Sequence, residues 1–319
     1  MRRASGLFVL ALVSATVSAG QASTLVSTDF SKGGSKGWCL NGDARLGRAA
    51  EAKLAGPGSK RPDHVLELTS SGQAQTGVAW TVMKCRVSAF SYVADVRIRF
   101  DPRGPGDLPA DGFTMAFAPV DTGTIGGGGG SLGLFGGAIE RFTAFEINTW
   151  RGQGLDPPDA PAASIGKNET FAFDVITPRV ENPDRAQGFP PADPKKGGAK
   201  IGQIVPPKGM KIVNGGWYRY QWDAADDGTM RVYVTGLDGA NRRFQKVKVL
   251  ETRIGFNPIG FEGRFGLTAA SGGAVQRAEV ARVRIEGATV TREASAGGSE
   301  RPRPRPLAQA IASSLRSPR

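Results

Sequence analysis

Residues 90–100 read FSYVADVRIRF, with an apolar side chain at every second position from Phe90 to Phe100. Most of the residues between them are polar or charged, as at Ser91, Asp95 and Arg97. In an extended chain, successive side chains point to opposite faces, so a period of two places the apolar residues on one face. The stretch therefore predicts a long strand with one face in a hydrophobic core.

The same period continues later in the chain. It recurs in Met230–Val234, in Val247–Val249 and in Val283–Ile285. Asp227-Gly228 and Asp238-Gly239 flank the first of these segments, and Asp-Gly between alternating runs favours tight turns. Helical periodicity is nearly absent outside the C-terminal tail. The sequence therefore predicts an all-β chain built from two packed antiparallel sheets.

The N-terminus has the three-part layout of a secretory signal peptide. Two arginines at positions 2 and 3 precede the apolar run Leu7–Val17, and small residues follow this run. We expect residues 1–22 to be this signal, with cleavage after Ala19 or Ala22. The run is about half of the ~20 residues that span a bilayer. The predicted location is secreted, periplasmic or at the cell envelope, and an uncleaved anchor is the alternative.

The chain has two cysteines, Cys39 and Cys85, and one histidine. These counts exclude a structural zinc site with four thiolate or imidazole ligands. In an exported protein an even cysteine count favours a disulfide, so we expect a Cys39–Cys85 bridge. Two buried free thiols are the alternative.

Composition divides the exported chain into a sandwich and a tail. We expect a β-sandwich over residues 23–287, interrupted at 178–207 by a Pro- and Gly-rich insertion loop on the surface. Residues 288–319 form a basic tail containing RPRPRP, which we expect to be disordered. Half of the net charge of +12 lies in the signal and the tail. The sequence lacks a basic-aromatic recognition motif, so we expect no nucleic-acid partner and only weak attraction of the tail to an anionic envelope.

Three stretches resemble the L-type lectins, the legume-lectin or concanavalin A-like family, and in particular its bacterial secreted members. In order, they are Ala110-Asp111-Gly112 followed by FTMAFAP, then GGGGGSLGLFGG (126–137) leading into FTAFEINTW (142–150), and finally RFGLTAASGG (264–273). GWCLNGDA from Gly37 and GVAW ending at Trp80 are also similar. The resemblance covers about Thr28 to Gly287. It implies a jelly-roll β-sandwich with a shallow sugar site at one end.

Family positions, transferred residue by residue, give the candidate sugar site. Asp111 resembles the sugar-binding aspartate, Gly130 the glycine whose N–H donates to the sugar, and Trp150 the aromatic residue beneath it. The fourth loop of the site corresponds to Gly272, Gly273 and Ala274. A carboxylate at a turn can accept two hydroxyl hydrogen bonds, which independently suits a polyol. The residues alone also allow an aspartate that only stabilises a turn, and a glycine loop that is only flexible.

The metal positions of the family depart from its pattern here. The resemblance implies Glu146, Asn148 and Asp156 as candidate calcium ligands. Asn148 stands where family members have a bridging aspartate, Gly152 replaces a residue that contacts calcium and sugar, and Ser164 replaces the histidine ligand. Without an imidazole we expect no transition metal. Lower ligand charge means that calcium is expected to bind weakly, if it binds.

The predicted function is glycan or polysaccharide binding without catalysis. One alternative is a structural or adhesive sandwich that has lost its sugar site, which the glycine at position 152 favours. A glycoside hydrolase on the same fold is a further alternative, but it needs two carboxylates across a cleft and Glu146 has no second glutamate nearby. The family often pairs its sheets edge to edge, so a homo-oligomer is also open.

Overall fold

The computed structural model describes residues 22–48, 62–99, 111–134, 139, 141–149, 172–177, 199–204, 215–237, 246–253 and 257–289. Within these residues the regular structure is fifteen strands and two short 3-10 helices, η1 (Phe30–Lys32) and η2 (Gly129–Ser131). The prediction of an all-β chain is confirmed. No helix in the described ranges is long and apolar enough to cross a bilayer. The predicted signal before residue 22 lies outside these ranges, as does the tail beyond Thr289.

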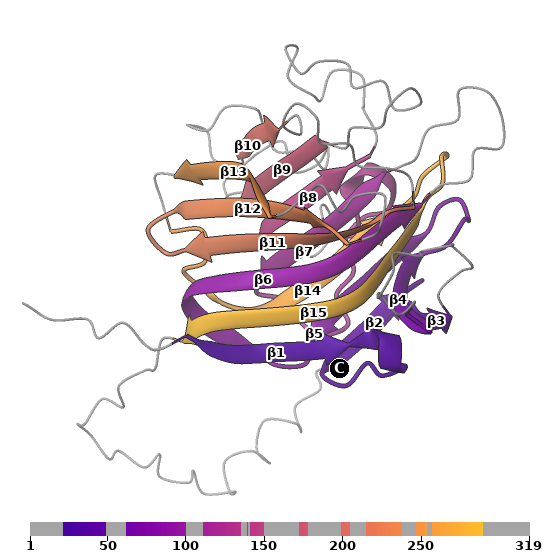
Figure 1. The fold of residues 1–319 in the computed structure, drawn as a ribbon, viewed down its shortest axis with the longest axis horizontal. Coiled ribbons are helices and arrows are strands. Elements are labelled where there is room, and N and C mark those ends of the chain that lie inside the picture. Colours follow the sequence, from indigo (N-terminus) through magenta and orange to yellow (C-terminus); the bar gives the residue numbers. More distant parts are fainter. Residues whose placement is uncertain are drawn as a thin grey trace, which may run out of the picture.

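One layer, which we call the back sheet, contains eight antiparallel strands. It comprises β1 (Ser23–Asp29), β3 (Arg45–Arg48), β4 (His64–Thr69), β6 (Cys85–Arg99), β11 (Trp217–Ala225), β12 (Thr229–Gly236), β13 (Val247–Arg253) and β15 (Arg277–Thr289). The long strand β15 pairs with β6 on one side and with β1 and β4 on the other. Strands β11, β12 and β13 continue the sheet beyond β6 (Figure 1).

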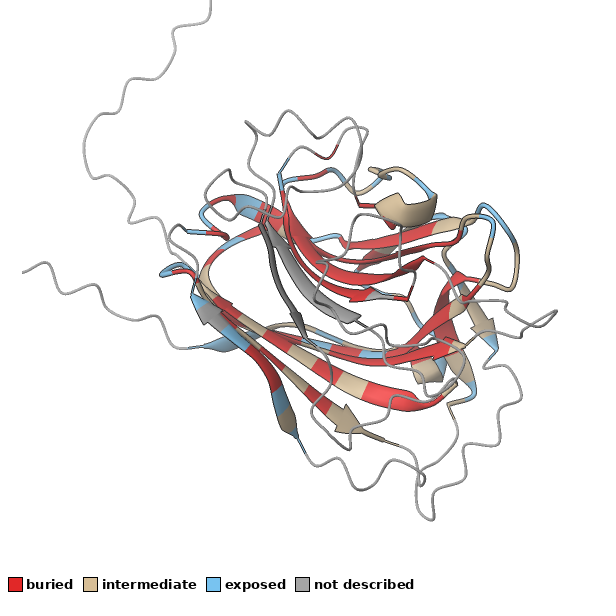
Figure 2. Cartoon of the chain, turned by 90° about the horizontal axis from the view of Figure 1, so that it is seen from above, coloured by how far each residue is buried: buried red, intermediate tan, exposed pale blue. Residues whose placement is uncertain are grey.

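The second layer, the front sheet, has the order β2-β5-β14-β7-β8-β9-β10. Its strands are β2 (Trp38–Gly42), β5 (Thr76–Thr81), β7 (Gly112–Ala118), β8 (Thr143–Asn148), β9 (Ala172–Thr177), β10 (Ala199–Ile204) and β14 (Glu262–Ala270). The two sheets meet where Glu262 and Gly263 of β14 pair with Arg86 and Cys85 of β6. Seen from above, the sheets lie face to face with buried residues along their facing sides (Figure 2).

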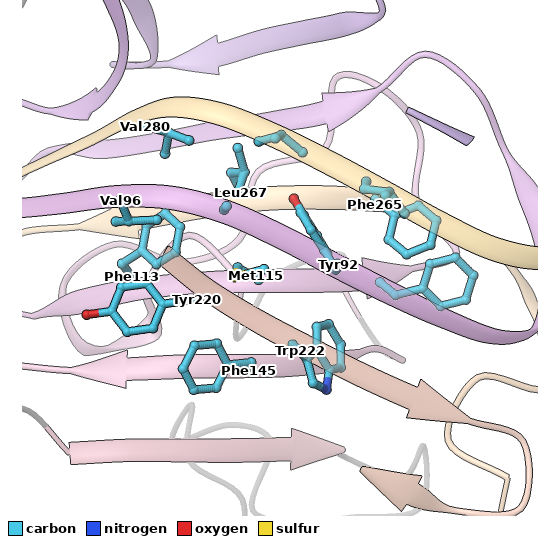
Figure 3. Packing of buried hydrophobic residues seen from close by; sticks show 14 of the residues in the cluster. Tyr92, Val96, Phe113, Met115, Phe145, Tyr220, Trp222, Phe265, Leu267 and Val280 are labelled. Atoms are coloured by element: carbon cyan, nitrogen blue, oxygen red, sulfur yellow. The ribbon is translucent and has the colours of Figure 1, made fainter. Parts of the chain in front are cut away.

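The core lies between the sheets and uses the predicted alternation of β6. Phe90, Tyr92, Ala94, Val96 and Ile98 are all buried in it. Facing them from the front sheet are aromatic and aliphatic side chains such as Phe113, Met115 and Phe265 (Figure 3). The phenol of Tyr92 donates a hydrogen bond of 3.1 Å to the carbonyl of Gly266 across the core. This buried hydrogen bond joins the back sheet to the front sheet through the core.

A second apolar layer covers the outer face of the front sheet. Trp80 and Ala116 on that face pack against Leu132 and Leu134 from the loop that follows β7. The indole of Trp80 donates a 2.7 Å hydrogen bond to the carbonyl of Thr124 in the same loop. The loop that carries the candidate glycines is therefore held down on the sheet.

Several details of the prediction can be compared with this fold. β6 runs from Cys85 to Arg99, and Asp227-Gly228 forms the turn between β11 and β12, with Gly228 at φ 84°. Asp238-Gly239 lies outside the described residues. Within the predicted insertion loop 178–207, residues 199–204 are not loop: they form β10, which pairs with β9. Its sequence AKIGQI has no regular alternation, because Ile201 and Ile204 are three residues apart and the pairing shifts register between them.

The expected disulfide is not present. The structure describes Cys39 and Cys85 as free thiols, and their registers explain why. Cys39 pairs with Trp80, whose side chain lies on the outer face of the front sheet. Cys85 lies in the core between the sheets. Since directly paired residues share a face, the two thiols point away from each other. Burial and the neighbouring Glu262 raise the pKa of Cys85 to about 11.

The outer face of the back sheet contains a fully buried ion pair. Arg97 of β6 and Glu279 of β15 face each other in register and are both 0% exposed. Arg97 Nε donates to Glu279 Oε2 at 2.5 Å, and the guanidinium lies 5.0 Å from the ring centre of Trp217 on the next strand. A buried pair of this kind is costly to break, because either partner alone leaves an uncompensated charge.

Candidate functional site

Asp111 lies directly before β7, where the backbone fixes it from two sides. Its N–H donates 2.9 Å to the carbonyl of Ala270, the last residue of β14. Its carbonyl accepts a 3.2 Å hydrogen bond from the N–H of Thr149, directly after β8. The end of β14, the start of β7 and the end of β8 are neighbours in the front sheet, so the sheet itself brings these segments to one edge.

The Asp111 carboxylate is buried and incompletely hydrogen-bonded. The residue is 9% exposed, and its Oδ2 has no hydrogen-bond partner among the described residues. Burial raises its pKa to about 6, while the backbone N–H of Gly272 acts in the opposite direction by stabilising the anion. At neutral pH the group is therefore an anion with an acceptor oxygen to spare. Burying such an anion lowers the stability of the fold unless a donor binds to it.

Two glycines stand against this oxygen. A Cβ at Gly272 would lie 3.2 Å from Asp111 Oδ2, and a Cβ at Gly129 would lie 3.7 Å from it. Gly129 also has φ 59°, a conformation that side chains rarely adopt. Because Gly129 and Gly272 have no side chain, their backbone atoms line the site next to Asp111 Oδ2. Gly130, the predicted glycine, is the next residue of η2 and is half-buried.

The glycine loop has a defined conformation. Leu132 ends η2 at φ 55°, and its N–H donates to the carbonyl of Gly129. Gly133 donates 2.8 Å to the carbonyl of Gly127, and Thr268 of β14 donates its hydroxyl to the carbonyl of Leu132 at 2.6 Å. The described part of this loop is thus hydrogen-bonded to itself and to the sheet, unlike the merely flexible loop that the glycines alone allowed.

The loop between β14 and β15 carries the other predicted residues, Gly272, Gly273 and Ala274. Ser271 anchors its start: its N–H donates 2.9 Å to the carbonyl of Gln75, and its hydroxyl donates 2.8 Å to the carbonyl of Gly72. Ala74 donates 3.0 Å to the carbonyl of Gly272 while adopting φ 52°. Ala74 and Leu132 are the non-glycine residues of positive φ in the described ranges, and both lie in loops at this site. Backbone strain of this kind concentrates at functional sites.

The metal positions are only partly described. Glu146 is buried on β8, and the register places it between Thr114 and Asp174. Asn148 is the last residue of β8, paired with Gly112, whereas Asp156 lies outside the described residues. No three histidine, cysteine, aspartate or glutamate side chains gather in the described ranges.

None of the described residues at the predicted metal positions is a histidine. The single histidine of the chain, His64, begins β4, where Gly33 faces its imidazole, so no imidazole serves the predicted metal positions. Of the predicted calcium ligands, Glu146 is a buried carboxylate and Asn148 is neutral. Calcium at these positions therefore stays a prediction.

Trp150 also lies outside the described residues, so its predicted stacking on a sugar stays a prediction. The structure adds two residues that sequence reasoning missed. Gln276 is fully buried, with its side chain bonded to Thr149 and to the carbonyl of Gly112. The two residues are Gln276 and Thr149. Neither could be recognised from the sequence, because a glutamine or a threonine at the end of a strand is common.

Comparison with known proteins gives fold relatives only. No family model matches the sequence, and no curated protein matches it. Among solved structures, the basic winged bean lectin with Tn-antigen has a TM-score of 0.55 and 17% identity, covering 81% of this chain and 94% of the lectin.

Two other lectins agree with that result. The lectin from Bauhinia forficata in complex with GalNAc has a TM-score of 0.56 and 15% identity over 84% of this chain and 100% of its own. The exoplasmic/lumenal domain of VIP36, in a Ca2+/Man-bound form, has a TM-score of 0.51 and 10% identity, covering 81% and 85% of the two chains. The chain therefore has the concanavalin A-like β-sandwich fold of the L-type lectins, as its sequence motifs predict.

Proposed function

We propose that this protein binds a glycan through Asp111, at the end of the front sheet, without catalysing a reaction. The observation that carries the proposal is the buried Oδ2 of Asp111, which has no hydrogen-bond partner in the described ranges and is walled by Gly129 and Gly272. Similar lectin structures that contain GalNAc or mannose support a sugar as the ligand class.

The chemistry of the site suits a polyol. A carboxylate oxygen accepts hydrogen bonds from hydroxyl groups, and a charge-assisted bond is stronger than a neutral one. A bound hydroxyl would supply the donor that Asp111 Oδ2 lacks among the described residues. The glycine walls let a ring approach the backbone of η2 and of the loop after β14, where N–H groups can donate to other hydroxyls.

The remaining parts of the proposal concern context. We propose that residues 1–22 export the chain to the envelope or the medium, and that the tail after 288 is attracted weakly to anionic surfaces. Calcium at Glu146, Asn148 and Asp156 stays a proposal, as does homo-oligomer formation. A glycan rather than a nucleic acid is the proposed partner.

A glycan array of the full chain tests the proposal, run with calcium and again with chelator. The variant is Asp111→Asn, which keeps the shape of the side chain and removes its charge. The matched control is Asp121→Asn, because the Asp121 side chain is 89% exposed and its interaction among the described residues is a 3.4 Å ion pair with Lys84.

We expect array binding that Asp111→Asn weakens at least tenfold and Asp121→Asn leaves unchanged. Chelator sensitivity would show that calcium takes part. No binding by the folded wild-type chain would refute the proposal and favour the structural or adhesive sandwich.

A further inference from the structure

The buried amide of Gln276 links two segments that contact the backbone of Asp111. Its Oε1 accepts a 2.5 Å hydrogen bond from the hydroxyl of Thr149, and its Nε2 donates 2.8 Å to the carbonyl of Gly112. Gln276 and Thr149 are both 0% exposed. Buried hydrogen bonds of this kind are expensive to lose, since each partner left behind is desolvated.

These bonds act on the backbone of Asp111 itself. Gly112 is its neighbour in the chain, and the N–H of Thr149 donates 3.2 Å to the Asp111 carbonyl. The third contact is the bond from the Asp111 N–H to Ala270. Gln276 thus holds the residue that follows Asp111 and the residue that binds the Asp111 carbonyl. One side chain therefore fixes the backbone on the carbonyl side of Asp111.

Gln276 is in turn fixed to the back sheet. Its carbonyl accepts a 3.0 Å hydrogen bond from the hydroxyl of Thr69, the last residue of β4. The same hydroxyl accepts 3.1 Å from the N–H of Ala278 on β15. Gln276 therefore extends from the end of the β4–β15 pair to the edge of the front sheet, where the candidate site lies.

We propose that Gln276 is a positioning residue that holds Asp111 in its buried place through hydrogen bonds supplied by the chain alone. The inference rests on the proposed function, since the position of Asp111 matters for binding only if a glycan binds there. Burial of a carboxylate oxygen without a partner is unfavourable, so the backbone of Asp111 has to be held in place. This clamp, formed by Gln276, Thr149 and Gly112, does not depend on an ion at Asn148.

The test uses Gln276→Met, which keeps the length of the side chain and removes both hydrogen bonds, and Thr149→Val, which removes one of them. The matched control is Thr143→Val. Thr143 lies at the opposite end of β8, is also 0% exposed, and donates its hydroxyl 2.6 Å to the carbonyl of Pro258. The full chain is used throughout, the variants in chelator and the wild type both in chelator and in calcium.

The first readout is amide hydrogen exchange in peptides that cover residues 111–118 and 143–149, without any sugar. We expect Gln276→Met and Thr149→Val to raise exchange at Asp111 and Thr149 at least tenfold, with Thr143→Val affecting only the start of β8. Wild-type exchange is expected to be the same with calcium and with chelator.

The second readout is affinity for the best array glycan. Gln276→Met is expected to weaken it about tenfold, and the double variant with Thr149→Val no further, because both changes remove the same bond. Thr143→Val keeps wild-type affinity.

Unchanged exchange at Asp111 in Gln276→Met would overturn the clamp. So would a wild-type chain whose Asp111 exchange rises to the Gln276→Met level in chelator. A wild-type chain that binds no glycan would refute the proposed function instead, while the exchange measurement still decides on the clamp.

Discussion

Replacing Asp111 by asparagine should stabilise the fold at neutral pH, because it removes a buried charge that the described residues do not fully compensate. The pKa of Asp111 is about 6 in the folded chain, against 3.8 for an ordinary aspartate. Each unit of this difference corresponds to about 1.4 kcal/mol, so the charge costs at most about 3 kcal/mol of folding free energy above pH 6.

The sign of the pH dependence follows from proton binding. Between pH 3.8 and 6 the folded chain holds a proton on Asp111 that the unfolded chain has lost. The free energy of unfolding therefore decreases as the pH rises through this window, and the loss is complete above the folded pKa. Asparagine has no such dependence. The stability difference between the two chains should be near zero at pH 4 and reach up to about 3 kcal/mol at pH 7.

Urea denaturation of both chains between pH 4 and 8 measures this difference, and the effects of all other carboxylates cancel in it. Glycan binding should show the opposite preference: wild-type affinity should fall as the pH drops below 6, because a protonated Asp111 is a weaker acceptor. A stability difference that stays constant with pH, or a wild-type chain that is the more stable one at pH 7, would refute a buried and uncompensated Asp111.

Three further predictions concern the surroundings of the site and the two sheets. Gly272→Ala should cost about 1 kcal/mol of stability and weaken glycan binding, because its Cβ would lie 3.2 Å from the Asp111 carboxylate. At Gly273 a Cβ would have open space, so Gly273→Ala should leave stability unchanged in thermal melts. Arg97→Met should destabilise the fold by about 3–5 kcal/mol in urea denaturation, because Glu279 then stays buried without its cation. The double variant Arg97→Met with Glu279→Leu should recover most of this loss. A double variant no more stable than the single one would contradict that reasoning. A reducing agent should leave the melting temperature unchanged, because both cysteines are free thiols; a fall of several degrees would show that a disulfide had formed.

The alternation of residues 90–100 was enough to predict β6 and the face that it buries. That pattern works because a core between two sheets selects apolar side chains at every second position. The pairing of distant strands is different, since it depends on registers that single-strand patterns do not encode. The prediction of a Cys39–Cys85 disulfide was wrong for this reason, because a cysteine count carries no information about which face of a sheet each thiol occupies.

In the candidate site, too, local motifs could be predicted from the sequence and long-range contacts could not. Asp111 and the glycine loop were predicted because the L-type lectin motifs contain them, and the structure brings Asp111, Gly129 and Gly272 together. Gln276 was not predicted, because its role comes from a long-range hydrogen bond to Thr149, 127 residues away in the chain. No local pattern signals such a contact.

The most direct test of the central claim is a crystal structure of the full chain with the best array glycan bound. The account predicts a sugar hydroxyl within about 3 Å of Asp111 Oδ2, with the ring resting against Gly129 and Gly272. A sugar bound elsewhere on the sandwich, or an Oδ2 that the protein itself satisfies while the sugar is bound, would contradict it.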